Sequence, residues 1–255
     1  MSDKIKTGLK LWSANTKLFE NAVKLHENTI LDFLELYIVP GSYLITKPFF
    51  GTLGKLPIII HGPHFSHNFN MADSKLKSTN IAKIIETIQF ADELNAKYII
   101  LHPGYDGNLE TSINFLKEIG DKRVIIENLT KASLSDGECL GHSPEEITRL
   151  VRFANGLCLD LAHACKAAVS LKKNYKTFIK EFTKMEPKMF HISDGRLNTE
   201  KDEHLPLGQG NFDLAFFKKC IIENKSRMVT FETPRKNLNS FQEDMENIRY
   251  FEALQ

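Results

Sequence analysis

Residues 123–161 read RVIIENLTKASLSDGECLGHSPEEITRLVRFANGLCLDL. Two apolar segments, Arg123–Glu127 and Leu157–Leu161, flank a helical pattern in this stretch. Ser143–Glu146 (SPEE) predicts the start of the helix, because it combines a serine cap, a proline in the first turn and a glutamate three residues after the cap. Gly156 predicts where the helix stops. Near-continuous apolar runs are typical of parallel strands buried on both faces, so the stretch reads as strand, helix and strand.

Similar apolar segments recur along the whole chain. The eight segments are Gly8–Trp12, Phe33–Val39, Pro57–His61, Tyr98–His102, Arg123–Glu127, Leu157–Leu161, Met189–Ile192 and Met228–Glu232. Helical patterns lie between them, among them 81–91, Leu214–Asn224 and Phe241–Ala253. Eight alternating units predict an α/β fold, a closed (β/α)8 barrel that forms one domain over residues 1–255. No GxGxxG follows the first strand, which argues against a dinucleotide-binding open sheet.

Composition and charge narrow the class of protein. The chain has 255 residues, of which 42% are hydrophobic and 25% charged, as in a globular protein with a sizeable core. The net charge of +1 gives no general attraction to nucleic acid. We find no run of about eighteen apolar residues and no signal peptide, so we expect no membrane partner. Cys139, Cys158, Cys165 and Cys220 form no CxxC pair, which favours a reduced, cytoplasmic compartment.

Residues that can bind metal end six consecutive predicted strands. They are His61, His102, Glu127, Asp160, His191 and Glu232, and His163 follows Asp160 by three positions. In a barrel all these ends meet at one mouth, where active sites lie. Several carboxylates and imidazoles at one mouth would be costly without a cation to neutralise them. The sequence therefore predicts a metal site at the carboxyl-terminal face of the barrel.

The segments that follow three of the strands add further candidates. Asp202 and His204, in the loop DEHLPLGQG, can both face one metal from an extended backbone, although a solvated charged loop is the alternative. His64 and Phe65 come directly after the third strand and could contact substrate, with a packed loop as the alternative. We also assign tentative substrate contacts to Arg196 and Arg235.

The order and placement of these motifs resemble endonuclease IV (AP endonuclease family 2) and the xylose isomerase-like TIM barrels over nearly the whole chain. The motifs are IIIHGPHF, IILHPGYDG, VIIENLT, CLDLAHA, FHISDGR, DEHLPLGQG and FETPR. The resemblance implies three sets of metal ligands. The sets are His61, His102 and Glu127 for a first metal; Glu127, Asp160, His191 and Glu232 for a second, with Glu127 bridging; and His163, Asp202 and His204 for a third.

The resemblance also implies an activity. The protein would be a metal-dependent hydrolase of DNA repair that binds abasic duplex DNA and cleaves the phosphodiester 5′ to the abasic site. Imidazole and carboxylate ligands suit zinc, about three ions per chain, with manganese possible. Such metals generate a hydroxide from bound water and stabilise charge on the phosphate. Glu127, Asp160 and Glu232 are the residues to which we assign catalysis.

Two alternatives stay open at this point. Glu35, in LELYI, is more like a sugar isomerase strand, and residues 37–50 lack the basic and aromatic residues that endonucleases push into the base stack. A sugar or sugar-phosphate isomerase or epimerase would need one divalent metal, on Glu127, Asp160, His191 and Glu232. A non-catalytic, metal-containing sugar-binding barrel is the other alternative. The oligomeric state is not predicted.

Overall fold

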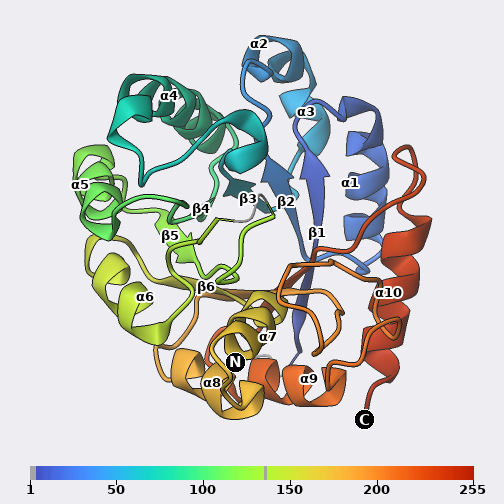
Figure 1. Cartoon of the computed structure of the whole chain (residues 1–255). Coiled ribbons are helices and arrows are strands. Elements are labelled where there is room, and N and C mark those ends of the chain that lie inside the picture. Colours follow the sequence, from blue (N-terminus) through green and yellow to red (C-terminus); the bar gives the residue numbers. More distant parts are fainter. Residues whose placement is uncertain (1–3, 135–136) are drawn as a thin grey trace.

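The computed structural model describes residues 4–134 and 137–255. Within them, eight parallel strands form a closed barrel in chain order, which confirms the predicted (β/α)8 fold (Figure 1). The strands are β1 (Lys6–Trp12), β2 (Phe33–Tyr37), β3 (Ile58–His61), β4 (Ile99–Leu101), β5 (Val124–Glu127), β6 (Leu157–Asp160), β7 (Met189–Ile192) and β8 (Met228–Phe231). Each strand pairs with its two neighbours in the chain, and β8 closes the barrel by pairing with β1.

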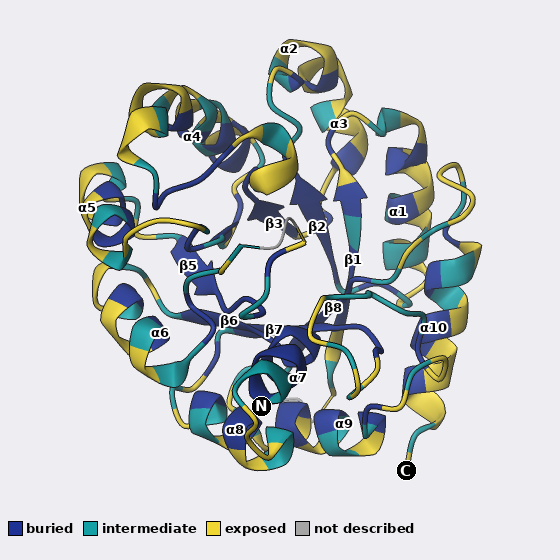
Figure 2. Cartoon of the chain, in the orientation of Figure 1, coloured by how far each residue is buried: buried dark blue, intermediate teal, exposed yellow. Residues whose placement is uncertain are grey.

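Helices surround the barrel on its outside (Figure 1). They are α1 (Phe19–Glu27), α2 (Tyr43–Thr46), α3 (Phe50–Leu53), α4 (Lys77–Glu93), α5 (Leu109–Ile119), α6 (Pro144–Leu150), α7 (Leu161–Ser170), α8 (Tyr175–Thr183), α9 (Leu214–Glu223) and α10 (Gln242–Ala253). Figure 2 shows the physical basis of the sequence pattern: the strands are mostly buried, with exposed residues at both ends of β1, whereas most helices are buried only toward the barrel.

Alternation along the strands divides the core into two parts. The smaller part consists of residues from the strands alone, so it fills the inside of the barrel. Its members are Phe33, Ile59, Ile100, Ile125, Cys158, Met189 and Met228. The larger part joins the outward side chains of the strands, such as Ile58 and Ile60, to helix residues such as Phe90 and Phe217. The inner apolar layer is thin, so inward positions nearer the carboxyl end of each strand can carry polar side chains.

Helix α6 begins as predicted but ends early. The Ser143 hydroxyl accepts a hydrogen bond from the backbone N–H of Glu146 at 3.3 Å, as expected of a helix cap. The prediction that Gly156 stops the helix is wrong, because α6 ends at Leu150 and a 3₁₀ turn, Val151–Phe153, comes next. Gly156, with φ +139°, lies instead in the connection to β6.

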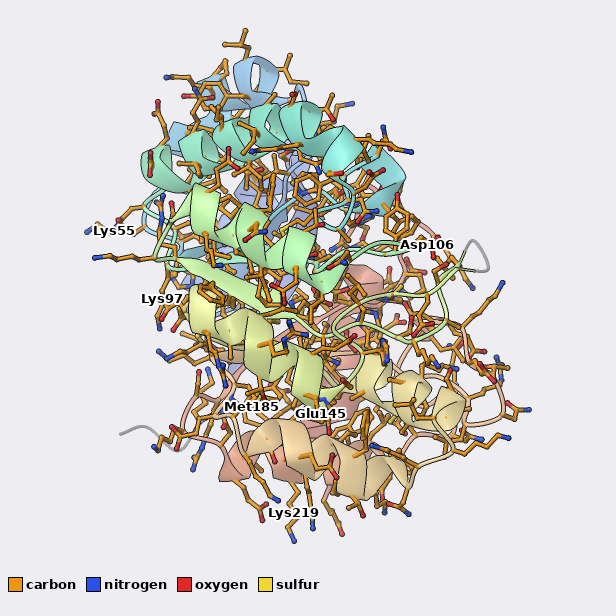
Figure 3. All side chains as sticks on the ribbon, turned by 60° about the vertical axis from the view of Figure 1, so that its left-hand side comes forward. Lys55, Lys97, Asp106, Glu145, Met185 and Lys219 are labelled. Atoms are coloured by element: carbon orange, nitrogen blue, oxygen red, sulfur yellow. The ribbon has the colours of Figure 1, made fainter. Side chains whose placement is uncertain are left out.

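The two ends of the barrel carry different connecting segments. In Figure 3, Lys55 and Lys97 lie at one end, where the chain enters β3 and β4, and Asp106 lies at the other, beyond the carboxyl end of β4. In the described ranges, no helix has the length and apolar character needed to cross a membrane. The four cysteines are free thiols.

The inner layer makes one stability prediction. A methyl group on Gly8 would lie 2.2 Å from Cε2 of Phe33, whose buried ring fills the inside of the barrel. We expect Gly8→Ala to lower the free energy of unfolding by about 1–3 kcal/mol, because the ring must leave its rotamer or β1 must shift. Gly51→Ala is the control, since nothing lies within 4 Å of its new methyl group. Urea denaturation that finds the two variants equally stable would refute the packing described here.

Candidate metal centre

A layer of polar side chains lies directly above the inner apolar layer of the barrel. Residues two apart on a strand share a face, so an inward residue is followed two positions later by another inward residue. Five pairs of this kind are Ile59 and His61, Ile100 and His102, Ile125 and Glu127, Cys158 and Asp160, and Met189 and His191. Strand geometry alone therefore turns these polar side chains toward one another at the carboxyl ends of the strands.

Glu127 lies at the centre of this layer and is fully buried. Its Oε2 is 3.1 Å from Nε2 of both His61 and His102. Its Oε1 is 3.3 Å from Nδ1 of His191 and 3.4 Å from Nδ1 of His163. Although burial raises the pKa of the Glu127 carboxyl, the nearby His191 and His102 bring it well below its usual value. Glu127 is therefore an ionised carboxylate whose two oxygens face different sets of imidazoles.

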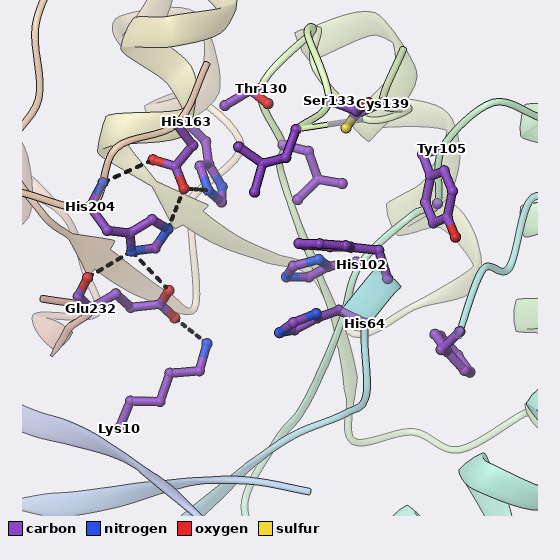
Figure 4. A pocket seen from close by; sticks show the side chains of 16 residues that line it. Lys10, His64, His102, Tyr105, Thr130, Ser133, Cys139, His163, His204 and Glu232 are labelled. Atoms are coloured by element: carbon purple, nitrogen blue, oxygen red, sulfur yellow. Dashed lines mark hydrogen bonds and ion pairs between the residues drawn. The ribbon is translucent and has the colours of Figure 1, made fainter. Parts of the chain in front are cut away.

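Candidate ligand atoms gather in groups whose members all lie within 4.8 Å of one another. Three groups are His61, His102 and Glu127; Glu127, Asp160, His191 and Glu232; and His163, Asp202 and His204. The structure thus brings together the same three sets that the resemblance implies. Part of the third group, with Glu232 beside it, is seen in Figure 4. Glu35, His61 and Glu232 form a fourth group, which the sequence analysis did not contain.

The second group fits a divalent cation. Three of its buried atoms, Glu127 Oε1, Asp160 Oδ2 and His191 Nδ1, have no hydrogen-bond partner in the described residues. His191 Nδ1 and Glu127 Oε1 lie 3.3 Å apart, whereas Asp160 Oδ2 has no ion-pair partner in the described residues, and a buried atom left in this state costs about 1–3 kcal/mol. His191 Nδ1 is also only 2.8 Å from Glu232 Oε1, so these atoms point at a common space. Imidazole nitrogens with carboxylate oxygens are a donor set for zinc or manganese.

Hydrogen bonds fix the orientation of three of the imidazoles. Nδ1 lies 2.8 Å from the Gly62 carbonyl in His61, 2.9 Å from the Asn128 carbonyl in His163 and 2.7 Å from the Glu232 carbonyl in His204. Because a carbonyl oxygen only accepts, Nδ1 carries the hydrogen and donates in each case. Nε2 is therefore the nitrogen that faces the ligand group and would bind a cation in place of a proton, which is how metal-binding histidines are usually oriented.

Glu35 plays the same orienting role for His191 and was missed as a site residue. Nε2 of His191 donates to Glu35 Oε2 at 2.9 Å, and both side chains are fully buried. This pairing leaves Nδ1 of His191 for the second group. Glu35 follows the inward Phe33 by two positions, so alternation along β2 was a signal that could have found it.

Lys10 is the second residue that sequence analysis missed. Its Nζ is 2.5 Å from Glu232 Oε1 and 3.7 Å from Glu35 Oε1. Although burial lowers the pKa of Lys10, the carboxylates of Glu232 and Glu35 raise it above its usual value, so the side chain is charged. Lys10 follows Gly8 by two positions on β1, and the packing of Gly8 against Phe33 shows which face points inward.

A cavity of about 490 Å³ opens onto these groups (Figure 4). Its polar lining includes Lys10, His102, His163, Asp202, His204 and Glu232, and its apolar lining includes Phe65, Phe69, Tyr105, Leu129 and Leu134. The ring of His64 stacks on Phe65 and His102, with centroids 4.9 and 5.5 Å apart. Burial, together with the charges of the neighbouring histidines, lowers the pKa of His64 to about 2, so this ring is neutral.

The four tentative substrate contacts divide into two pairs. His64 and Phe65 line the cavity. Arg196 lies outside its lining and binds Glu203 Oε1 at 2.8 Å. Arg235 binds Asp244 Oδ2 at 2.6 Å and lines an adjoining cavity of about 360 Å³. Both guanidinium groups therefore pair with carboxylates of their own chain, and their contact with substrate stays a prediction.

Fold and ligand groups together define a class: a (β/α)8 barrel with grouped imidazoles and carboxylates at its carboxyl-terminal face. The sequence profile described as xylose isomerase-like TIM barrel matches residues 50–253, and the chain belongs to this family.

Its relatives include proteins named for different chemistry. A probable endonuclease 4 of Mesomycoplasma hyopneumoniae strain 7448 is 27% identical over 193 residues, 69% of this chain and 68% of that protein. Endonuclease IV from Thermus thermophilus superposes with a TM-score of 0.71 at 24% identity over 98% of both chains. A D-tagatose 3-epimerase-like protein also gives 0.71, at 20% identity over 98% of both chains. Likeness of fold therefore does not separate the two chemistries.

The orienting role of Glu35 can be measured. We expect Glu35→Gln to weaken zinc binding by about 10–100-fold, because the amide lacks the charge that strengthens His191 as a ligand. Glu93→Gln, which removes an exposed carboxylate paired with Lys47, is the matched control and should leave affinity unchanged. Competition with a chelator of known affinity gives both values. Wild-type affinity in Glu35→Gln would show that Glu35 does not tune the site.

Proposed function

We propose that this protein is a metal-dependent phosphodiesterase that incises DNA on the 5′ side of abasic sites. The observation that supports this is the third ligand group, His163, Asp202 and His204, which lies beside the other two. A single cation on the four-residue group would serve an isomerase. A phosphodiester carries charge on its attacking, leaving and non-bridging oxygens in the transition state, so several cations suit it better.

Divalent cations bound here would turn a bound water into a hydroxide at neutral pH and stabilise charge on the phosphate. Glu127 would be shared by the first two groups, because its two oxygens face different imidazoles. Asp160 caps α7 with one oxygen, accepting from the His163 backbone N–H at 2.6 Å, which leaves its Oδ2 for the second group. Glu232 reaches the same group from the end of β8.

Lys10 would contribute a fixed positive charge to substrate binding. It is the one lysine or arginine lining the central cavity in the part of the chain that the structure describes. An ammonium group in a partly dry cavity interacts strongly with a phosphate oxygen. A cavity of about 490 Å³ also excludes a duplex, so the abasic nucleotide would have to turn out of the helix to reach the ligand groups.

A sugar or sugar-phosphate isomerase or epimerase is the second candidate. The buried pair of Glu35 and His191 favours the isomerase, because Glu35 orients His191, a member of the four-residue group that would hold one cation. That cation would polarise a carbonyl or a pair of hydroxyls. A non-catalytic barrel that binds sugar through metal would leave the same substrates unchanged, so turnover separates it from both enzymes.

The proposed function has a direct assay. A labelled duplex with one tetrahydrofuran abasic analogue should be incised by zinc-loaded protein, leaving a 3′-hydroxyl, while the undamaged duplex stays intact. We expect His163→Ala to reduce incision by about a hundredfold or more, because it removes a ligand of the third group. His26→Ala is the control, since its ring hydrogen-bonds to the Leu31 carbonyl on the barrel's outside.

Two results would overturn the proposal. One is the absence of incision by zinc- and manganese-loaded protein at low salt, where contacts to phosphate are strongest. The other is full incision by His163→Ala, which would remove the reason for a third cation. Interconversion of a ketose or sugar phosphate, together with no incision, would put the isomerase in its place.

A further inference from the structure

Lys166 is a fully buried lysine that belongs to none of the ligand groups. It lies on α7, three residues after His163, so the two side chains share a face of the helix. The connection from β7 to α9 passes over this face and carries the other two members of the third group, Asp202 and His204. One helix therefore presents a candidate ligand and, one turn later, an ammonium group to the same loop.

Among the described residues, the hydrogen-bond partners of the Lys166 ammonium all lie in this loop. Its Nζ donates to the Arg196 carbonyl at 2.7 Å, to the Thr199 hydroxyl at 2.6 Å and to Glu203 Oε2 at 2.5 Å. Glu203 stands between Asp202 and His204 in the chain, and its Oε2 also accepts from the Arg196 backbone N–H at 2.8 Å. These contacts thus fold residues 196–203 around the buried ammonium group of Lys166.

A separate buried anion closes the base of the loop. Asp194, almost completely buried, accepts four backbone N–H groups with its two carboxylate oxygens. The donors are Gly195 at 2.8 Å, Gly208 at 3.0 Å, Gly210 at 2.8 Å and Phe212 at 3.3 Å. Because none of these bonds involves Lys166, the base would stay closed without it. The lysine therefore acts on residues 196–204 and not on the whole connection.

The backbone at His204 needs such support. Its φ of +47° lies in the left-handed region, which residues other than glycine rarely adopt. The ring of His204 is fixed by the Nδ1 hydrogen bond to the Glu232 carbonyl at 2.7 Å. Its backbone is restrained through the preceding residue, Glu203, which is bound by Lys166. Both restraints direct the Nε2 atom of His204 toward Asp202.

We propose that Lys166 is a positioning residue that holds Asp202 and His204 opposite His163 before any cation binds. This inference rests on the proposed function, in which the third group holds a cation. Without the ammonium, Glu203 would lose its buried partner and keep only the half-exposed guanidinium of Arg196 at 2.8 Å, so it would move toward solvent. Asp202 and His204 flank it and would move with it, so a cation would have to order the loop as it binds.

The test counts metal ions in a variant with a neutral side chain of similar length. Lys166→Met and wild-type protein are loaded with zinc, dialysed against a graded chelator buffer and measured by elemental analysis. We expect Lys166→Met to lose one ion per chain at a free zinc concentration that saturates wild type, with affinity of that site reduced about 10–100-fold. The control is Lys176→Met, whose ion pair with Asp213 is exposed, and it should retain every ion.

A second variant covers the case in which Lys166→Met fails to fold. Glu203→Gln removes the partner charge from the loop side, where the side chain is 18% exposed, and should lose the same ion while the chain still unfolds in one cooperative transition. Retention of wild-type zinc affinity by both variants would overturn the inference. Loss of all ions in both would do so too, since it would mean that Lys166 supports the barrel and not one group.

A readout without metal separates this inference from the proposed function. In metal-free protein, limited proteolysis should cleave within residues 196–204 faster in both variants than in wild type, because the loop has lost its ion pair with α7. Equal cleavage rates would contradict the positioning role. If wild-type protein binds only one zinc ion, the proposed function fails, and the cleavage rates still decide whether Lys166 orders the loop.

Discussion

The two oxygens of one buried carboxylate, Glu127, lie between 3.1 and 3.4 Å from ring nitrogens of four histidines. A buried anion is stable only where opposite charge or hydrogen-bond donors surround it, and these four come from different elements of the barrel. They can meet there only if the barrel is closed and if its strands keep a common register. The polar layer thus depends on the apolar layer below it, which sets that register.

Buried charges also fix the side chains and the loop around this polar layer. Glu35 orients His191, Lys10 contacts Glu232, and Lys166 contacts Glu203, so each of three carboxylates has a cationic or imidazole partner. An ion pair of this kind adds little net stability, because desolvation offsets the attraction. The ion pair instead fixes the positions of the side chains that form it. In our account, these pairs fix where ligand atoms point before a cation arrives.

The fold and the ligand groups could be predicted from sequence because both follow local rules. Apolar runs identify strands, and parallel strands in a barrel bring their carboxyl ends together. Glu35 and Lys10 follow the same alternation, but they lie inside apolar segments. The sequence analysis selected only the polar residues at the ends of the predicted strands, so it missed them. Lys166 could not be found, since its partners lie 30–37 residues further along the chain and only folding brings them near. Helix α6 shows the same limit, because its end depends on packing and not on Gly156.

The number of divalent ions that the chain binds tests the central claim most directly. Protein purified without chelator, loaded with zinc and freed of excess metal would be measured by elemental analysis. The account predicts about three ions per chain, one for each ligand group that the resemblance and the structure share. A saturating value near one ion per chain would contradict it and would favour the chemistry of a sugar isomerase.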